Sequence, residues 1–196
     1  MRYLLVSLVH PALNAADYLD FFSGMSPLLK VVVPLVVLIT TLLISRARHV
    51  SFVTDLGLVR PPLLPLLGWL LLALVWMLAS DSVLHWRGTF DFHPWQAQPL
   101  WVSIARVLGV GILGPVAEEL VVRGMVFARL RSAGLPVVIV ILLTAAGWSL
   151  LHLDYTPAVI LIIFIEGLLL GSARQYTGSL LVPILLHIAW NFYAVW

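Results

Sequence analysis

The stretch GPVAEELVVRG, residues 114–124, places two adjacent carboxylates and an arginine in a chain otherwise dominated by Leu, Val, Ile and Ala. Hydrophobic residues make up 62% of the 196 residues and charged residues only 10%, whereas soluble domains are typically about a quarter charged. This composition indicates an integral membrane protein. The polar stretch therefore lies where lipid or a dry protein interior is expected, and ionisable groups in such places usually mark function.

Around this stretch, the chain contains six apolar windows that could cross a bilayer, which requires about 20 residues. They cover residues 28–44, 63–79, 100–130, 136–153, 158–173 and 179–195. Since no repeat and no soluble domain is evident, we expect an all-α, polytopic membrane protein with about six transmembrane helices in one bundle. Residues 1–99 would hold a short interfacial segment and two transmembrane helices, and residues 100–196 a core of four helices.

Arginines in the short connections predict how the helices are oriented. Three connections, after the first, third and fifth windows, carry most of these residues: Arg46, Arg48 and Arg60, then Arg129 and Arg131, then Arg174. Short loops rich in Lys and Arg stay in the cytoplasm. We therefore place these three connections on the cytoplasmic side and both termini on the other side, with residues 80–99 as an external cap.

The composition also excludes several classes of site. The chain has no cysteine, which rules out disulfides, thiol catalysis and cysteine-based zinc sites. The net charge is only +2, and no basic run carries interleaved aromatic residues. We therefore expect no nucleic-acid partner.

A small set of polar residues remains inside the expected helices: Glu118, Glu119, Arg123, His152, Glu166, His187 and Asn191. Glu119 and Arg123 are four residues apart, so they can pair along one helix face and leave Glu118 free to face another helix. His187 and Asn191 repeat this spacing in the last window.

The order of the helices predicts where these groups meet. If the third and fourth helices form an antiparallel hairpin, Glu118 and His152 lie at similar depth, given a rise of about 1.5 Å per residue. With His187 and Asn191, they would bring a carboxylate, two imidazoles and an amide into one cavity. A carboxylate beside an imidazole can take a proton from water, and a second imidazole with an amide can stabilise an oxyanion. This set can hydrolyse a peptide bond without a covalent enzyme intermediate.

The motifs resemble those of the CPBP intramembrane proteases, also called the CAAX protease and bacteriocin-processing (Abi) family. Residues 118–123 match Glu-Glu-x-x-x-Arg, and residues 187–191 match His-x-x-x-Asn. Residues 148–152 match Phe-x-x-x-His with Trp148 in place of Phe, and we expect this tryptophan to be a packing or interface residue. The similarity covers about residues 100–191, including the order and spacing of the motifs.

The resemblance implies a role for each motif residue. Glu118 would be the catalytic base and His152 would share in activating water, while His187 and Asn191 would form the oxyanion site. Glu119 with Arg123 would support them structurally.

The resemblance also implies an activity, a CAAX-type, glutamate-dependent intramembrane endopeptidase. It would cleave a membrane-embedded or lipid-anchored protein tail in the bacterial inner membrane, with the lipid bilayer and the anchored substrate as partners. The chain has no Gly-x-Ser-x-Gly elbow, which disfavours a serine enzyme.

No cofactor is favoured, although the family is often labelled metalloprotease. The alternative is a zinc ion held by Glu118, His152 and His187. No His-Glu-x-x-His helix is present, and Asn191 beside His187 suits an oxyanion site. We therefore favour the metal-free mechanism.

Other functions stay open at this point. One is a non-catalytic membrane scaffold or immunity protein of the same fold. Another is a small proton-coupled carrier, since Glu and His also build proton relays, although carriers often show repeats that this chain lacks. Glu166 matches none of the three motifs. It could cap a polar pocket, pair with Arg174 or line a substrate path, and we expect a structural role.

Overall fold

The computed structural model describes residues 28–87, 97–153 and 155–195. The expected N-terminal interfacial segment and much of the expected cap at residues 80–99 lie outside these described residues. Within them every regular element is helical. The expected all-α membrane architecture is confirmed.

The helices follow the six apolar windows. The first two are α3 (Leu29–Ala47) and α4 (Leu63–Leu84). The third window forms one continuous stretch that alternates α-helical and π-helical segments: α6 (Leu100–Arg106), η2 (Val107–Leu113), α7 (Gly114–Glu119), η3 (Leu120–Val126) and α8 (Phe127–Ser132). The last three are α9 (Val137–Ser149), which ends in the 3-10 turn η4 (Leu150–His152), α10 (Pro157–Thr177) and α11 (Leu181–Val195).

Four of these stretches are long and apolar enough to cross a membrane, with 19, 22, 33 and 21 residues. Val137–His152 and Leu181–Ala194 are shorter apolar helices. Val137–His152 includes the 3-10 turn η4 and lies within the expected window 136–153, whereas Leu181–Ala194 is shorter than the window 179–195 because residues 178–180 form a loop before α11. In contrast, α4 continues to Leu84, beyond the expected end at residue 79.

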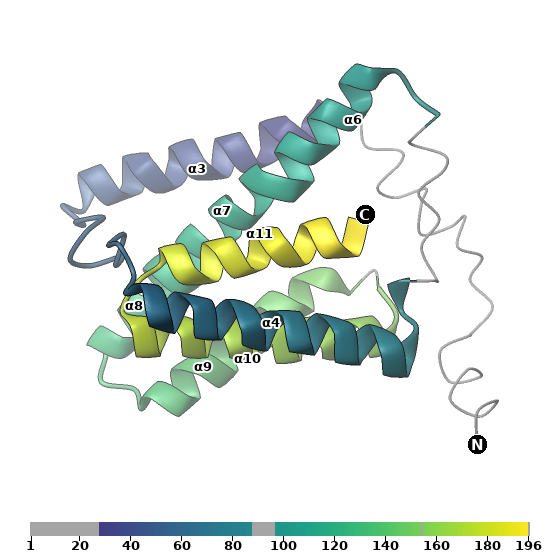
Figure 1. The fold of residues 1–196 in the computed structure, drawn as a ribbon. Coiled ribbons are helices and arrows are strands. Elements are labelled where there is room, and N and C mark those ends of the chain that lie inside the picture. Colours follow the sequence, from purple (N-terminus) through teal and green to yellow (C-terminus); the bar gives the residue numbers. More distant parts are fainter. Residues whose placement is uncertain (1–27, 88–96, 154, 196) are drawn as a thin grey trace.

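The three arginine-bearing connections lie at the same end of the bundle, on the left in Figure 1. Two of them are in direct contact: the Leu180 backbone N–H donates to the Gly57 carbonyl at 2.7 Å, and Arg174 Nη2 donates to the Leu56 carbonyl at 3.2 Å. The arrangement agrees with the grouping predicted from the arginines.

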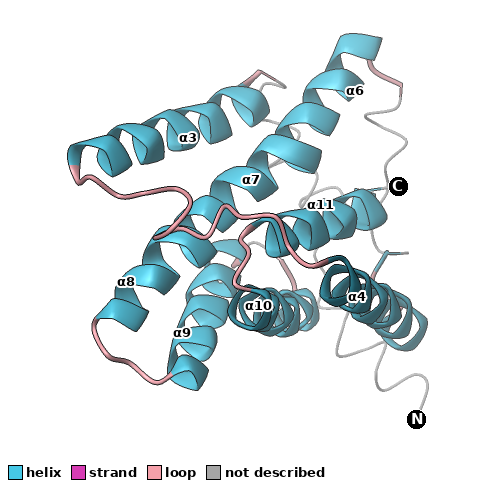
Figure 2. Ribbon diagram, turned by 60° about the vertical axis from the view of Figure 1, so that its left-hand side comes forward, coloured by secondary structure: helices cyan, strands magenta, loops and turns pink. Residues whose placement is uncertain are grey.

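The apolar side chains divide between a core and an outer surface. The larger core cluster joins α4, α9, α10 and α11 through buried residues such as Met77, Trp148, Ile162 and Trp190. Leucines and valines on the outer faces of α3 and α4 stay exposed, as expected for surfaces that face lipid. Figure 2 shows α11 lying between α4, α7 and α10, and the side chain of His187 on α11 is buried.

Helix α3 packs tightly against the π-helical segment η2 at Gly109. A Cβ atom on Gly109 would collide with the Lys30 carbonyl group, so no side chain fits there. We therefore expect Gly109→Ala to push α3 off η2 and to lower the free energy of unfolding by about 1–3 kcal/mol. Denaturant titration of the purified protein in micelles measures this change.

Gly68→Ala in α4 is the matched control, since a Cβ there meets nothing within 4 Å. Alanine also favours helix over glycine, so this variant should be neutral or slightly stabilised. Equal stability of the two variants would contradict the packing role of Gly109.

Candidate active site

The two adjacent carboxylates end α7, which lies between the π-helical segments η2 and η3. Successive helical residues point about 100° apart, so Glu118 and Glu119 face different surroundings. The Glu119 side chain is fully buried, whereas that of Glu118 is 38% exposed. π-helical turns are frequent at functional sites, and here two of them flank the carboxylates.

Glu119 holds a buried charge cluster together. Arg123 Nη1 donates to Glu119 Oε1 at 2.6 Å, and His187 Nδ1 lies 3.0 Å from the same oxygen. The pairing of Glu119 with Arg123 that the sequence predicts is therefore present. Arg123 Nη2 also donates to the Gly167 carbonyl at 3.3 Å, which ties the cluster to α10.

The cluster defines which nitrogen of His187 carries a proton. A carboxylate oxygen that pairs with Arg123 acts as an acceptor, so Nδ1 of His187 is the donor to Glu119. Nε2 of a neutral His187 then carries the lone pair. This nitrogen lies 4.0 Å from Glu118 Oε2, which is too long for a direct hydrogen bond.

Trp148 connects the buried and exposed carboxylates. Its Nε1 donates to Glu118 Oε2 at 2.6 Å, and the Arg123 guanidinium carbon lies 4.6 Å above its ring. Trp148 is buried, as expected, but besides packing it also forms a hydrogen bond with Glu118. The substitution of Trp for Phe in the second motif was the available signal, because a buried indole N–H usually finds an acceptor.

His152 and Asn191 form hydrogen bonds with backbone carbonyls. His152 Nδ1 is 3.0 Å from the Trp148 carbonyl, and the His152 ring makes an edge contact with the Trp148 ring at 5.4 Å. Within the described residues His152 forms no hydrogen bond with Glu118, although both contact Trp148. Asn191 Nδ2 donates to the Val110 carbonyl of η2 at 2.8 Å, which engages one of its two N–H groups.

The three candidate zinc ligands do not assemble into a metal site. Within residues 28–87, 97–153 and 155–195, no group of three His, Asp or Glu side chains is placed to hold a metal ion. Glu118 Oε2 accepts from Trp148, and His187 Nδ1 bonds Glu119.

Glu166 is buried in α10 and makes no hydrogen bond with these residues in the described parts of the chain. The pairing with Arg174 that the sequence left open is not formed. Arg174 instead donates to the carbonyls of Arg123, Gly178 and Leu56.

The comparison with known protein families matches residues 99–193 to the family described as type II CAAX prenyl endopeptidase Rce1-like. The matched region runs from just before α6 into α11, so it includes every residue of the candidate site. Neither the curated proteins nor the solved structures include a match.

Proposed function

Because residues 99–193 match the family described as type II CAAX prenyl endopeptidase Rce1-like, we propose that the protein is a glutamate-dependent intramembrane endopeptidase. Its substrate would be a membrane-embedded or lipid-anchored protein tail. The bacterial inner membrane would be its location.

The assignment of Glu118 as the base rests on its exposure: Glu118 is the partly exposed member of the carboxylate pair. Its Oε2 accepts a hydrogen bond from Trp148 at 2.6 Å and lies 4.0 Å from Nε2 of His187. The partner carboxylate, Glu119, is buried in its ion pair. The buried Glu119 therefore suits a structural role, and the solvent-accessible Glu118 suits the role of general base.

We infer the following order of events from these contacts. A water molecule between Glu118 and His187 donates one hydrogen bond to each. Its oxygen attacks the carbonyl carbon of the scissile peptide bond while its proton passes to Glu118. Glu118 then gives this proton to the leaving nitrogen as the carbon–nitrogen bond breaks, so no covalent enzyme intermediate forms.

The hydrogen bonds of His152 and His187 also indicate which group can donate to the oxyanion. His152 Nδ1 faces a backbone carbonyl and His187 Nδ1 faces a carboxylate, so both neutral imidazoles present an acceptor at Nε2. The second N–H of the Asn191 amide is therefore the donor we assign to the oxyanion. His187 would join it only when both ring nitrogens are protonated, and His152 would share in holding the water.

Comparing membrane-protein C-termini tests the proposed activity. One strain carries the wild-type chain, and a second carries Glu118→Gln at matched abundance. We expect specific tails to be shortened only by the wild type, which would identify the substrate. Asp55→Asn is the control, because it makes the same carboxylate-to-amide change in the exposed α3–α4 loop.

Identical C-terminal profiles in the two strains would favour a non-catalytic scaffold. If the two profiles coincide, and Glu118→Gln still rescues another phenotype of deleting the chain, the endopeptidase assignment is wrong. A non-catalytic membrane scaffold or immunity protein would then replace it.

Trp148→Phe is expected to slow the enzyme while keeping its fold. Phenylalanine keeps a ring beneath Arg123 but removes the N–H that bonds Glu118. Hydrogen bonds to charged groups contribute about 1.5–3 kcal/mol, so we expect kcat/KM to fall at least about tenfold. Steady-state rates on the identified tail measure the change, with Trp69→Phe on α4 as control. Unchanged kcat/KM in Trp148→Phe would remove this tryptophan from the positioning of Glu118.

A further inference from the structure

Glu166 is a buried carboxyl group that the proposed mechanism does not use. It is the tenth residue of the 21-residue helix α10, near the middle of a membrane-spanning segment, and it is 3% exposed. Neither of its oxygens has a hydrogen-bond partner among the described residues. Burying a carboxyl group without a partner is costly, particularly where no bulk water is present.

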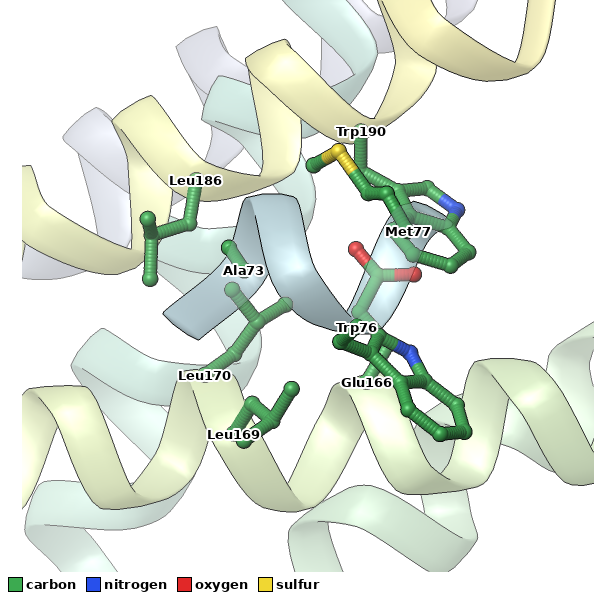
Figure 3. A pocket seen from close by; sticks show the side chains of 8 residues that line it. All are labelled: Ala73, Trp76, Met77, Glu166, Leu169, Leu170, Leu186 and Trp190. Atoms are coloured by element: carbon green, nitrogen blue, oxygen red, sulfur yellow. The ribbon is translucent and has the colours of Figure 1, made fainter. Parts of the chain in front are cut away.

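A second unpartnered polar group lies beside it. Trp76 Nε1 is also buried and has no acceptor among residues 28–87, 97–153 and 155–195. Both side chains line one cavity, together with Ala73, Met77, Leu169, Leu170, Leu186 and Trp190. Figure 3 shows the Glu166 carboxyl group directed between Trp76, Met77 and Trp190. An indole N–H can only donate, and a carboxyl oxygen accepts, so the cavity offers both functions within apolar walls.

The cavity has a lining of its own, although α10 and α11 contribute residues both to it and to the candidate active site. On α10, the Gly167 carbonyl binds Arg123, whereas the preceding residue, Glu166, faces the cavity. On α11, His187 bonds Glu119, whereas the preceding residue, Leu186, lines the cavity. The two sites therefore occupy neighbouring faces of α10 and α11.

The size of the cavity restricts what it can hold. Its volume is about 10 Å³ for a water-sized group, close to what one buried water requires. A hydroxyl is the small group that accepts one hydrogen bond and donates another. An ammonium group has no acceptor and would leave the Trp76 N–H without one.

We propose that this cavity is a hydroxyl-binding site in which one hydroxyl accepts from Trp76 Nε1 and donates to a Glu166 carboxyl oxygen. Water supplies such a group by itself. An amphipathic alcohol from the bilayer supplies the same group, with its hydrocarbon chain outside the cavity, beside the partly exposed Leu169. The chemistry at the polar end is identical for the two sources.

Indole N–H resonances test the proposal directly. The full-length protein is labelled with nitrogen-15 at its tryptophan indoles and studied in detergent micelles, with Trp76→Phe used to assign the resonance. We expect the wild-type Trp76 N–H to show a downfield, hydrogen-bonded shift and a cross-relaxation peak to water or to added n-hexanol. Both should disappear in Glu166→Leu, while the Trp148 N–H, which donates to Glu118, stays unchanged.

The two sources give different results. A saturable shift of the Trp76 N–H with n-hexanol, absent from Glu166→Leu, identifies an alcohol site. A cross-peak to water without a saturable shift identifies a water site. Glu166→Gln keeps an acceptor oxygen and nearly the same volume, so it should retain the contact even if Glu166→Leu fails to fold.

Two other results would overturn the proposal. A downfield shift without contact to water or hexanol would mean that Trp76 and Glu166 bond each other directly. A shift typical of an unbonded indole in the wild type, left unchanged in Glu166→Gln, would mean that the cavity binds no hydroxyl. Neither result depends on whether the chain is an endopeptidase.

Discussion

Replacing Arg123 with methionine is expected to lower the free energy of unfolding by about 3–5 kcal/mol, because the change leaves a buried carboxylate without its counter-charge. Arg123 and Glu119 are both fully buried and pair at 2.6 Å. Arg123 also bonds the Gly167 carbonyl, so its loss frees a second buried acceptor. Denaturant titration in micelles, followed by tryptophan fluorescence, measures the change.

Two further variants distinguish the loss of the Glu119–Arg123 ion pair from the general effect of removing an arginine. Arg129→Met removes the same charge from an exposed site on α8 and should change stability by less than about 0.5 kcal/mol. The double variant Glu119→Gln with Arg123→Met removes both buried charges, and the new amide oxygen can still accept from His187. It should therefore be more stable than Arg123→Met alone. A double variant that is less stable than Arg123→Met would show that the buried pair is not the source of the loss.

Sequence spacing predicted the local part of this site well. The pairing of Glu119 with Arg123 depends only on two positions four residues apart, and it is retained although η3 begins between them. The grouping of the arginine-bearing connections at one end was also predictable, because it follows from the order of six apolar helices.

Contacts that depend on tertiary packing could not be predicted from the sequence. Asn191 bonds the Val110 carbonyl in a π-helical segment, and hydrophobic periodicity does not reveal where such a segment forms. Trp148 looked like a core residue because nothing in the sequence indicates which acceptor its indole meets. The surroundings of Glu166 depend on α4, which is distant in the chain and supplies Trp76 and Met77.

Glu118→Gln is expected to lower kcat/KM by about 100- to 10,000-fold, the usual contribution of a general base, while leaving the fold intact. The substituted side chain can still accept from Trp148 through its amide oxygen, and the partly exposed site tolerates the lost charge. An amide cannot take a proton from water at neutral pH. Rates on the substrate tail and the midpoint of denaturation, measured on the same preparation, test both parts.

The neighbouring substitution provides the sharpest contrast, because Glu119→Gln makes the identical chemical change one residue away. Glu119 is sealed between Arg123 and His187, so this variant should lose stability through an unpaired buried arginine. Loss of rate at normal stability in Glu118→Gln, with loss of stability in Glu119→Gln, would separate catalysis from structure along one helix. If Glu118→Gln instead unfolds as easily as Glu119→Gln, Glu118 is part of the structural cluster and the base must be sought elsewhere.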